Sequence, residues 1–503
     1  MPTYTRYTAG PAPAARQSLW LRVLKMSVLA LVCFVALTAG VLAGFLQHTA
    51  AQVARNDPQE VQAAKPQLAA SQPGKPIDIL ILGSDRRAGQ PSLGARSDTL
   101  IVVRLDPRSG SISMLSVPRD LLVDIPGYGQ NKINAAYSLG GARLSLQVVK
   151  QLLGVPINDF IDINFDGFEQ VINRLGGAYL MIDHRYFNNT AVTNFASIDI
   201  QPGYQRLGGS QALDWVRFRH DQNGDFTRIV RQQMFLREMK RELVGSAQLQ
   251  SLPRFLAVMN VISHNVTSDI SSLGKLYQLL TLTLRLDTTH IYQTHIDGST
   301  PTIGGISYVT ATPQQVRAAA HQFLHPLRAP QRVAGGGPAR AVSRAAGSAG
   351  AGTSATRQAK ASKTVITDTP SHVAAWRALQ KASRLPLYLP ARLPGGLGYD
   401  QFRAYRVPTG SGEARAAVAV GTTPQGGFWD VQAIAWAGAP ILASPDASVT
   451  RDGRSYSLYY DGARLHMVAW RAGRVAYWVV NTLDDELSNG TMLALATSSV
   501  RVP

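Results

Sequence analysis

The stretch I-D-I-L-I-L-G-S-D-R-R, from Ile77 to Arg87, decides the fold class. Its apolar part, Ile77–Leu82, has the length of a strand and passes through a glycine into charged residues, which is typical of a buried strand with a polar end. Two further β-branched runs follow at Asp98–Leu105 and Ser111–Val117. Both carry charge at an end, and strand ends are where ligand crevices form in α/β sheets.

Helical segments alternate with strands after these runs. The spacing of apolar residues predicts helices at Leu144–Leu153 and Gly167–Leu175, and strands at Ile161–Phe165 and Ala178–Ile182. This alternation predicts an α/β sandwich over residues 76–327. Further helices are predicted at about Asp225–Leu243, Pro253–Asn265, Ser271–Leu284 and Pro313–Phe323, the last with Thr312 as N-cap.

The N-terminal region predicts a membrane anchor. Residues 1–25 carry arginine and lysine but no acid, and the uncharged run Met26–Leu46 has the length of a bilayer-spanning helix. Basic residues before the run place residues 1–25 in the cytoplasm and the rest of the chain outside the cell. The alternative is a cleaved signal peptide, favoured by small residues near the end of the run. Residues 47–75, rich in Ala, Gln and Pro, are predicted to be a tether.

The chain of 503 residues is strongly basic, with 50 Lys and Arg against 32 Asp and Glu and a formal charge of +18. Such an excess favours an anionic partner: nucleic acid, an acidic polymer, a phosphate ligand or a membrane surface. Part of the charge lies in the Ala-, Gly- and Ser-rich segment 328–369, which predicts a flexible basic linker. Cys33 is the only cysteine, which excludes a disulfide framework and a cysteine metal site.

Residues 370–503 predict a small α+β domain. Short aromatic-rich strands separated by turns such as Asp461-Gly462 predict an antiparallel meander, closed by a helix over about Leu487–Thr497. Its charged residues are scattered, so the sequence assigns this domain no role. The predicted strands are Phe428–Trp436, Tyr456–Tyr460, Arg464–Trp470 and Arg474–Asn481.

The most informative charged stretch is Ala212–Gln233, A-L-D-W-V-R-F-R-H-D-Q-N-G-D-F-T-R-I-V-R-Q-Q. Arg217 and Arg219 are two apart, so on an extended segment they point to one face. Arg228 and Arg231 are three apart near the start of the predicted helix and share a helical face. Guanidinium groups bind phosphate oxygens bidentately and keep their charge, so the cluster predicts an anion site. The alternative is a solvated basic face, with the aspartate at the helix start as a plain N-cap.

Two aspartates at strand ends are candidate metal ligands. Asp85 follows the first strand and Asp98 opens the second. There they can hold a divalent cation while Arg87, Arg96 and Arg119 hold phosphates, and magnesium is normally bound by one or two carboxylates together with substrate phosphates. The alternative is structural: one aspartate is a turn residue, and the other pairs locally with a neighbouring arginine.

Five charged motifs occur together and in order along the chain: G-S-D-R-R, R-S-D-T-L, S-V-P-R-D, N-K-I-N-A-A-Y-S-L-G-G and R-F-R-H-D-x-x-x-D-F-x-R-x-x-R-Q-Q. On these motifs the stretch Ile77–Leu243 resembles the LytR-CpsA-Psr family. The resemblance implies a central mixed sheet flanked by helices, with a polyprenyl tail held in an apolar tunnel. It also implies a membrane-anchored bacterial phosphotransferase outside the cell. Such an enzyme moves a glycopolymer from a polyprenyl pyrophosphate carrier to peptidoglycan and forms a phosphodiester.

The resemblance also implies roles for individual residues. Asp85 and Asp98 match the acids that bind Mg²⁺ (or Mn²⁺), and Asp225 is the candidate general base for the acceptor hydroxyl. A metal and fixed guanidinium groups suit phosphoryl transfer because they neutralise charge on phosphate oxygens. The residues expected to act in catalysis with Asp225 are Arg119, Arg217, Arg219 and Arg228. The further ligand-binding residues are Arg87, Arg96, Lys132, Arg231, Gln232 and Gln233.

Three other functions stay open. A nucleic-acid binder fits the basic charge, but a domain outside the cell cannot meet chromosomal DNA, so no nucleic-acid partner is expected. A hydrolase that releases the polymer from its carrier needs the same residues, with water in place of the sugar hydroxyl. A non-catalytic wall-binding scaffold is the third. The expected partners are the lipid-linked glycopolymer, peptidoglycan and membrane lipid.

Overall fold

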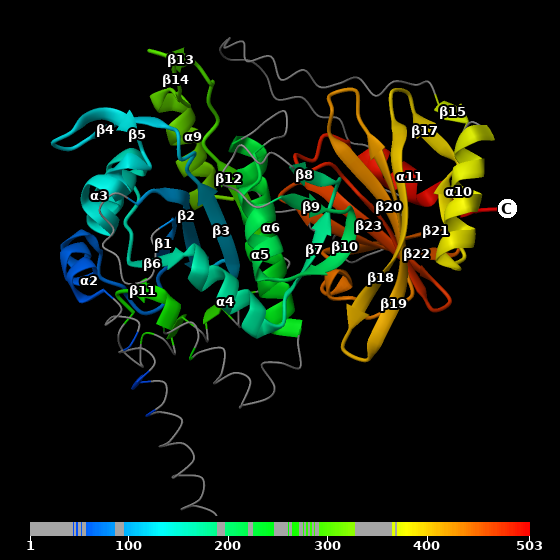
Figure 1. Ribbon diagram of the computed structural model, residues 1–503, viewed down its shortest axis with the longest axis horizontal. Helices are drawn as coiled ribbons and strands as arrows, with labels where there is room; N and C mark the ends of the chain where they lie inside the picture. The colour runs from blue at the N-terminus through cyan, green and yellow to red at the C-terminus, as the bar shows by residue number, and fades with distance from the viewer. Residues whose placement is uncertain are drawn as a thin grey trace, which may run out of the picture.

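The computed structural model describes residues 57–85, 95–188, 197–219, 225–245, 264–270, 291–326, 365–367 and 370–503, with single residues and short pieces within 44–52 and 260–286. Figure 1 shows two lobes, which we call the N-terminal lobe (57–326) and the C-terminal lobe (365–503). The predicted membrane span Met26–Leu46, apart from Gly44, and the linker stretch 328–363 lie outside the described residues, as do most of the two helices predicted between 253 and 284. No helix within the described ranges is long and apolar enough to cross a bilayer.

A six-stranded mixed sheet forms the centre of the N-terminal lobe. Its strand order is β11-β6-β1-β2-β3-β12. β1 pairs parallel with β6 and antiparallel with β2, and β12 closes one edge parallel to β3. The predicted strands and the mixed sheet are therefore confirmed. The strands are β1 (Ile77–Ser84), β2 (Ser97–Asp106), β3 (Ser111–Ser116), β6 (Asp159–Asn164), β11 (Val266–Ser268) and β12 (Ile291–His295).

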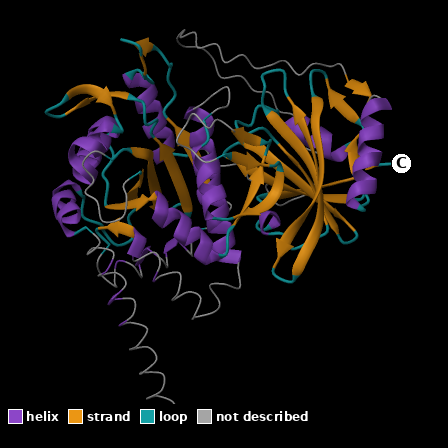
Figure 2. Ribbon diagram, viewed as in Figure 1, coloured by secondary structure: helices purple, strands orange, loops and turns teal. Residues whose placement is uncertain are grey.

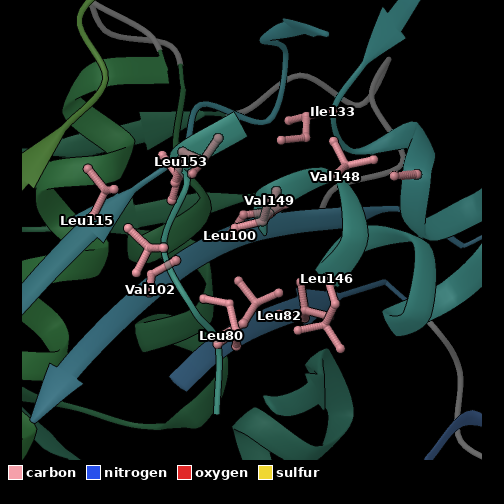
Figure 3. Packing of buried hydrophobic residues seen from close by; sticks show 14 of the residues in the cluster. Leu80, Leu82, Leu100, Val102, Leu115, Ile133, Leu146, Val148, Val149 and Leu153 are labelled. Carbon is pink, nitrogen blue, oxygen red and sulfur yellow. The ribbon is translucent and has the colours of Figure 1, made fainter. Parts of the chain in front are cut away.

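The helix α3 (Ala135–Leu153) covers one face of this sheet. Alternate residues of a strand share a face, so every second side chain of β1 and β2 points toward α3. In Figure 3 this buried cluster contains Leu80, Leu82, Leu100 and Val102 from the strands and Leu146, Val149 and Leu153 from the helix. The intervening residues Ile79 and Ile101 form a second cluster on the other face, where Leu236 of α6 (Asp225–Gly245) packs against them. Each fully buried side chain of this size stabilises the fold by about 1.5–3 kcal/mol.

Capping residues and glycines mark the helix ends. α4 (Phe165–Leu175) begins at Asn164, whose side chain accepts a hydrogen bond from the backbone N–H of Gly167, and ends at Gly176, where φ is 88°. Glycine adopts this left-handed conformation at little cost. α9 (Pro313–Leu324) has Thr312 as its N-cap, as predicted. The helix predicted at Leu144–Leu153 is the second half of α3, which continues back beyond a non-helical break at Gly140 and Gly141.

Part of the predicted tether is folded. α2 (Pro58–Ala64) and the 3₁₀ turn η1 (Lys65–Gln67) lie against α3, and Val61 and Ala64 of α2 are buried in the same cluster as the side chains of β1 and β2. The carboxylate of Glu60 accepts a hydrogen bond from the backbone N–H of Ala142. The prediction of a tether over 47–75 is therefore wrong for these two elements. An Ala- and Gln-rich composition that indicates a linker also has high helix propensity.

Further helices and ribbons lead from the central sheet to the C-terminal lobe. α5 (Gly209–Arg217) packs between α4 and α6. The ribbon of β7 (Ala178–Ile182) and β10 (Gly203–Leu207) lies beside α6, and β7 has the predicted bounds. Two-stranded ribbons elsewhere in the described part of the N-terminal lobe are β4–β5 (Leu122–Ile125 and Gly129–Lys132), β8–β9 (Tyr186–Asn188 and Ile198–Ile200) and β13–β14 (Thr302–Ile303 and Ile306–Ser307).

The C-terminal lobe is mostly sheet, as Figure 2 shows. Seven antiparallel strands in the order β18-β19-β20-β24-β23-β22-β21 form one sheet, and α10 (Pro370–Ser383) and α11 (Asn489–Thr497) pack on one of its faces. The four predicted strands and the final helix are confirmed, but the β18–β19 hairpin and α10 were not predicted. The strands are β18 (Gly398–Thr409), β19 (Gly412–Thr422), β20 (Phe428–Ile434), β21 (Ala447–Arg451), β22 (Arg454–Asp461), β23 (Arg464–Ala472) and β24 (Val475–Val480). Shorter pieces are β15 (Val365–Thr367), β16 (Tyr388–Pro390), β17 (Arg392–Pro394), η2 (Pro440–Leu442) and β25 (Ser499–Arg501).

The two lobes share a hydrophobic core. Tyr179 and Tyr204 of the β7–β10 ribbon are buried in one cluster with Trp478 of β24, and the Tyr204 and Trp478 rings meet edge-on at 6.0 Å. Tyr179 Oη donates to the backbone oxygen of Pro408 at 2.7 Å, and the backbone N–H of Tyr204 donates to Gln432 Oε1 at 3.0 Å. The C-terminal lobe therefore covers one side of the ribbon.

Candidate active site

A β-bulge sets the position of Asp98 at the end of the central sheet. Gly83 of β1 lies opposite Thr99 of β2, and Ser84 lies opposite Ser97, so Asp98 is an extra residue between the two pairs. A bulge re-aims a side chain, and bulges are enriched beside active sites. A Cβ atom at Gly83 would lie 2.9 Å from the Cβ atom of Thr99, so this close approach of the strands requires glycine.

Asp85 lies at the same end of the sheet, directly after β1. Its backbone N–H donates to the carbonyl oxygen of Arg96 at 3.1 Å, and its Oδ1 accepts from the backbone N–H of Arg96 at 2.5 Å. The side chain of Arg96 is exposed, and Arg87 lies outside the described residues. The two aspartates predicted to bind a metal thus both lie near the start of β2, Asp98 within the strand and Asp85 beside the residue that precedes it.

Two arginines from distant parts of the chain converge on Asp98. Arg119, which follows β3, donates to Oδ1 of Asp98, and Nη2 of Arg217 lies 3.6 Å from Oδ2. The Arg217 guanidinium also stacks on the ring of Phe165, 4.0 Å from its centroid. The three charged side chains are largely buried. Water and salt therefore screen these ion pairs less than they would at the surface.

A second carboxylate, Asp120, has three cationic neighbours. Its Oδ1 lies 2.9 Å from Lys132 Nζ, and its Oδ2 lies 3.0 Å from Arg219 Nη2 and 3.7 Å from Arg119 Nε. We call Arg119, Lys132, Arg217 and Arg219, with their two carboxylates, the cation cluster. Four cations against two carboxylates leave two positive charges, which favours an anionic ligand. Asp120 was not among the predicted site residues, although it ends the quoted S-V-P-R-D motif.

The polar residues of α6 are bonded to other parts of the protein. Arg231 is fully buried, donates to the backbone oxygen of Phe218, and lies 3.4 Å from Tyr186 Oη. Gln232 Nε2 donates to the backbone oxygen of Val216 at 3.3 Å. These bonds fix α6 against the segment that carries the two arginines of the R-F-R motif.

Gln233 joins α6 to the ends of β3 and β12. Its Nε2 donates to Ser116 Oγ at 2.8 Å and to the backbone oxygen of Thr294 at 2.7 Å. Arg228 is also buried, with 2% of its surface exposed. The solvated basic face considered for this helix is therefore excluded.

Arg217 does not lie on an extended segment, contrary to the prediction. It is the last residue of α5, and the chain leaves the helical conformation at its successor Phe218, the C-cap (φ −57°, ψ 141°). Val216 and Phe218 are buried. The apolar residues from Ala212 onward recur with helical spacing, however, and continue the helix to its arginine. Arg217 and Arg219 still reach the same cation cluster, each through a different carboxylate.

An acid that the sequence analysis missed lies beside this cluster. Burial raises the pKa of Asp214, on α5, to about 6, while the charge of Arg217 lowers this pKa and that of Glu169 raises it further. The one feature of the sequence that could have indicated a buried acid here is the position of Asp214 within an apolar helical run. Asp214 therefore titrates nearer to neutral pH than an exposed aspartate.

Asp85 and Asp98 can bind a magnesium ion only if other groups supply further oxygen ligands. Magnesium takes one or two carboxylates together with phosphate and water oxygens. Within the described parts of the chain, no group of three or more His, Cys, Asp or Glu side chains could hold a metal. A metal at these two aspartates would therefore need oxygens from a bound phosphate. Asp225 begins α6, but its side chain lies outside the described residues, so its role as base stays a prediction.

The fold and the site together define a class of protein. A mixed sheet lies beside four cations that surround two carboxylates, and such an excess of positive charge suits a phosphate-type anion. The chain belongs to the LytR_cpsA_psr family, whose sequence profile matches residues 42–323. The match confirms the family resemblance and ends before the C-terminal lobe.

Several individual proteins are similar to the chain. It is 36% identical over 185 residues to the regulatory protein MsrR of Staphylococcus aureus, and the match covers 36% of this chain and 54% of MsrR. It is 33% identical over 247 residues to the polyisoprenyl-teichoic acid--peptidoglycan teichoic acid transferase TagU of Oceanobacillus iheyensis, which covers 48% of this chain and 72% of TagU. Among solved structures, B. subtilis TagV is 29% identical, with 50% of this chain and 98% of that chain covered at a TM-score of 0.43. The chain thus spans about half the length of MsrR.

Proposed function

We propose that the protein transfers a glycopolymer from a polyprenyl pyrophosphate carrier to peptidoglycan. The observation that carries the proposal is the cation cluster, in which Arg119, Lys132, Arg217 and Arg219 surround two carboxylates at the strand ends. A pyrophosphate has oxygens enough for several guanidinium groups at once. The name of TagU, which is 33% identical to the chain, supports a lipid-linked donor and a peptidoglycan acceptor.

The proposed reaction forms one phosphorus–oxygen bond and breaks another. A hydroxyl oxygen of peptidoglycan attacks the phosphorus joined to the polymer, and the bond between that phosphorus and the bridging oxygen of the pyrophosphate breaks. The polyprenyl phosphate leaves with the electron pair. The hydroxyl proton passes to a base, for which Asp225 is the candidate. The product is a phosphodiester that joins the polymer to peptidoglycan.

The cation cluster supplies the positive charge that this reaction needs. In the protein alone, Asp98 and Asp120 hold the cations close together, and the phosphate oxygens of the donor take over these contacts. Donors already in place when charge develops are each worth about 100- to 1000-fold in rate. The buried Arg231, Gln232 and Gln233 contribute by fixing the elements that carry the cluster.

We also propose that Asp85 and Asp98 hold Mg²⁺ (or Mn²⁺) together with the pyrophosphate. A bound ion would neutralise further charge on the phosphate oxygens. Asp98 is bonded to Arg119 and Arg217 in the protein alone. Its carboxylate becomes available when these arginines turn to the phosphates. Metal and pyrophosphate are therefore expected to bind together.

The polyprenyl tail is proposed to lie between the central sheet and its helices. The candidate lining is apolar and comes from Leu144–Leu153, Phe160–Phe168 and Phe235–Leu243. The first of these segments packs against β1 and β2 in a buried cluster (Figure 3). α3 is interrupted at Gly140 and Gly141, so Leu144–Leu153 forms a separate helical segment over the sheet. A membrane anchor at residues 26–46 would keep the lobe close to the lipid donor.

One reaction mixture tests the proposal: the full-length chain in detergent, a synthetic lipid-pyrophosphate donor, peptidoglycan oligomers and Mg²⁺. A product in which the polymer is bound to peptidoglycan supports transfer. Free polymer, released equally with and without peptidoglycan, would identify a hydrolase. Peptidoglycan binding with an unchanged donor would identify a non-catalytic scaffold.

A further inference from the structure

A pocket of about 350 Å³ lies between the two lobes. Ligand sites in proteins have volumes of about 300–1,000 Å³. Phe218 lines the pocket and is the residue between Arg217 and Arg219 of the cation cluster in the sequence. The N-terminal lobe contributes a wall around Arg185, and the C-terminal lobe contributes two loops, around Gly426 and Asp484.

The wall from the N-terminal lobe presents an open aromatic ring. Phe187 is 48% exposed, and the guanidinium of Arg185 lies 4.6 Å from its ring centroid. Arg185 is held in turn by two hydrogen bonds to Asp199, at 2.8 and 2.9 Å. Next to them, His184 stacks on Phe428 of the other lobe, with centroids 4.2 Å apart and ring planes 15° apart. The aromatic wall is therefore ordered before any ligand arrives.

The buried carboxylate of Asp183 holds the His184 side chain in position. Nδ1 of His184 lies 3.0 Å from Oδ2 of Asp183, and Tyr186 Oη donates to Oδ1 of the same group at 2.6 Å. Burial acts to raise the pKa of Asp183, but its contacts with His184 and Tyr186 and the charge of Arg231 outweigh burial and leave this pKa below its ordinary value. Asp183 thus connects the pocket wall to α6 of the candidate active site.

The opposite wall is a loop held in one conformation by Asn481. Its side-chain oxygen accepts hydrogen bonds from the backbone N–H groups of Thr482 and Leu487, each at 2.9 Å, and its nitrogen donates to the backbone oxygen of Leu487, also at 2.9 Å. Leu483, within this loop, packs against the N-terminal-lobe cluster that contains Phe218. The loop is therefore anchored at both ends and against the other lobe.

The polar lining of the pocket suits hydroxyl groups better than phosphate. Asp484 and Glu486 face the pocket from this loop, and Arg185 is the cation opposite them, so a phosphate would meet an excess of negative charge. Carboxylates and the amide of Gln425 form hydrogen bonds with hydroxyl groups. The exposed ring of Phe187 offers an apolar surface to the carbon-bound face of a sugar ring.

We propose that this interlobe pocket binds a sugar unit of a glycan chain beside the phosphate-binding cations. The inference rests on the proposed function, since it adds a carbohydrate subsite to the same reaction. It also assigns a role in binding to the C-terminal lobe, because that lobe supplies the carboxylates of Asp484 and Glu486. The sugar belongs either to the donor polymer or to peptidoglycan, and both present the same hydroxyl-bearing rings.

Calorimetric titrations of the full-length chain distinguish the two sources. One probe is a β-1,4-linked tetramer of N-acetylglucosamine, which stands for the peptidoglycan glycan. The other is a polyprenyl pyrophosphate that carries a disaccharide, compared with the same lipid without sugar. Phe187→Ala and Asp484→Asn are the test variants. Val500→Ala and Glu413→Gln, at exposed positions elsewhere in the C-terminal lobe, are the matched controls.

Phe187→Ala is expected to weaken the binding of one sugar probe about tenfold, because the ring surface that a ligand covers is lost. A loss confined to the tetramer assigns the pocket to the acceptor. A loss confined to the sugar-bearing lipid, with the sugar-free lipid unaffected, assigns it to the donor.

Failure of the two proposals can be told apart. Equal affinities in wild type, both test variants and both controls would overturn the sugar subsite, and so would a wild-type chain that binds neither sugar probe. If the sugar-free lipid pyrophosphate does not bind the wild type, the proposed function fails. The tetramer titration then still decides whether the pocket binds sugar. Circular dichroism of each variant establishes that it is folded.

Discussion

Nη2 of Arg217 lies 3.6 Å from Oδ2 of Asp98, while Arg119 donates to the other oxygen of the same carboxylate. One aspartate thus holds together two arginines that come from the end of α5 and from the loop after β3. Without it, no carboxylate would offset the repulsion between the like charges of the two guanidinium groups. Asp98 therefore has a structural task in addition to the metal binding proposed for it.

Arg119→Ala and Arg217→Ala are each expected to lower the rate of transfer about 100- to 1000-fold and to leave the fold intact, because each removes one fixed cation from the phosphate site. Lysine at either position should restore only part of the rate, since it lacks bidentate geometry. Initial rates measure the effect, with Arg406→Ala, at an exposed arginine of the C-terminal lobe, as the control. Unchanged turnover in either alanine variant would remove the pyrophosphate assignment.

Mg²⁺ is expected to bind well only when a pyrophosphate is present, because two carboxylates without phosphate oxygens make a weak site. Asp98→Ala should lose more activity than Asp85→Ala, since Asp98 also holds two arginines of the cation cluster. Calorimetry of wild type and both variants, with and without a pyrophosphate analogue, measures metal affinity. Tight Mg²⁺ binding without the analogue would contradict the shared site. Activity of both variants in the presence of a chelator would leave these aspartates a structural role alone.

Gln233→Met is expected to destabilise the protein by about 1–3 kcal/mol, because the buried oxygens lose their donor and methionine cannot replace it. The lost bonds are those to Ser116 and Thr294. Urea unfolding measures the change. Gln314→Met, at an exposed position of α9, should stay within about 0.5 kcal/mol of wild type. Equal midpoints for the two variants would show that Gln233 does not support the strand ends.

Asp214 is expected to make the protein less stable as the pH rises through the window between its two pKa values. Its pKa is about 6 in the folded protein, against an ordinary value of 3.8 that applies to the unfolded chain. The folded state therefore binds the proton more tightly, and this stabilisation is complete below the lower pKa and lost as the pH rises through the upper one. The variant Asp214→Asn should lack this pH dependence of stability. The Tm of the variant minus the Tm of wild type should therefore increase as the pH rises between the two pKa values and then stay constant. A constant difference across the window would refute the shift.

Cleavage at a protease site inserted between residues 340 and 350 is expected to leave the two lobes associated. Tyr179, Tyr204 and Trp478 are buried between them, and their separation would expose this surface to water. Gel filtration of the cleaved protein measures association. Replacing the buried ring in Tyr204→Ala should promote separation, because removal of a large core side chain costs about 3–5 kcal/mol. Elution of cleaved wild type as two separate species would show that the shared core does not hold the lobes together.

Four strands of the central sheet, β1, β2, β3 and β6, could be predicted because each is a short apolar run followed by a glycine or a polar residue, whereas the edge strands β11 and β12 were not predicted. Elements with mixed patterns could not. β18 has side chains that are mostly half-buried along its whole length, so it lacks the strict alternation that identifies a strand. α2 has few apolar residues, and its place in the core depends on α3, which lies far along the chain.

The charged motifs predicted which residues gather at the strand ends, and Arg119, Lys132, Arg217 and Arg219 do meet there. The sequence could not show what each one contacts. Asp120 was missed because its partners lie on separate segments. The burial of α6 polar groups was also missed, because it depends on backbone oxygens that lie opposite the helix.

The core that the two lobes share affects how the protein loses its structure. Tyr179 and Met181 of β7 lie in one cluster with Ile434 and Trp478 of the C-terminal lobe, so neither lobe can unfold without uncovering part of the other. Heat or denaturant is therefore expected to unfold both in a single cooperative transition. Because the cation cluster exists only in the folded protein, the fraction of molecules that have it depends on residues far from the cluster. Many of these belong to a lobe that the family match does not reach.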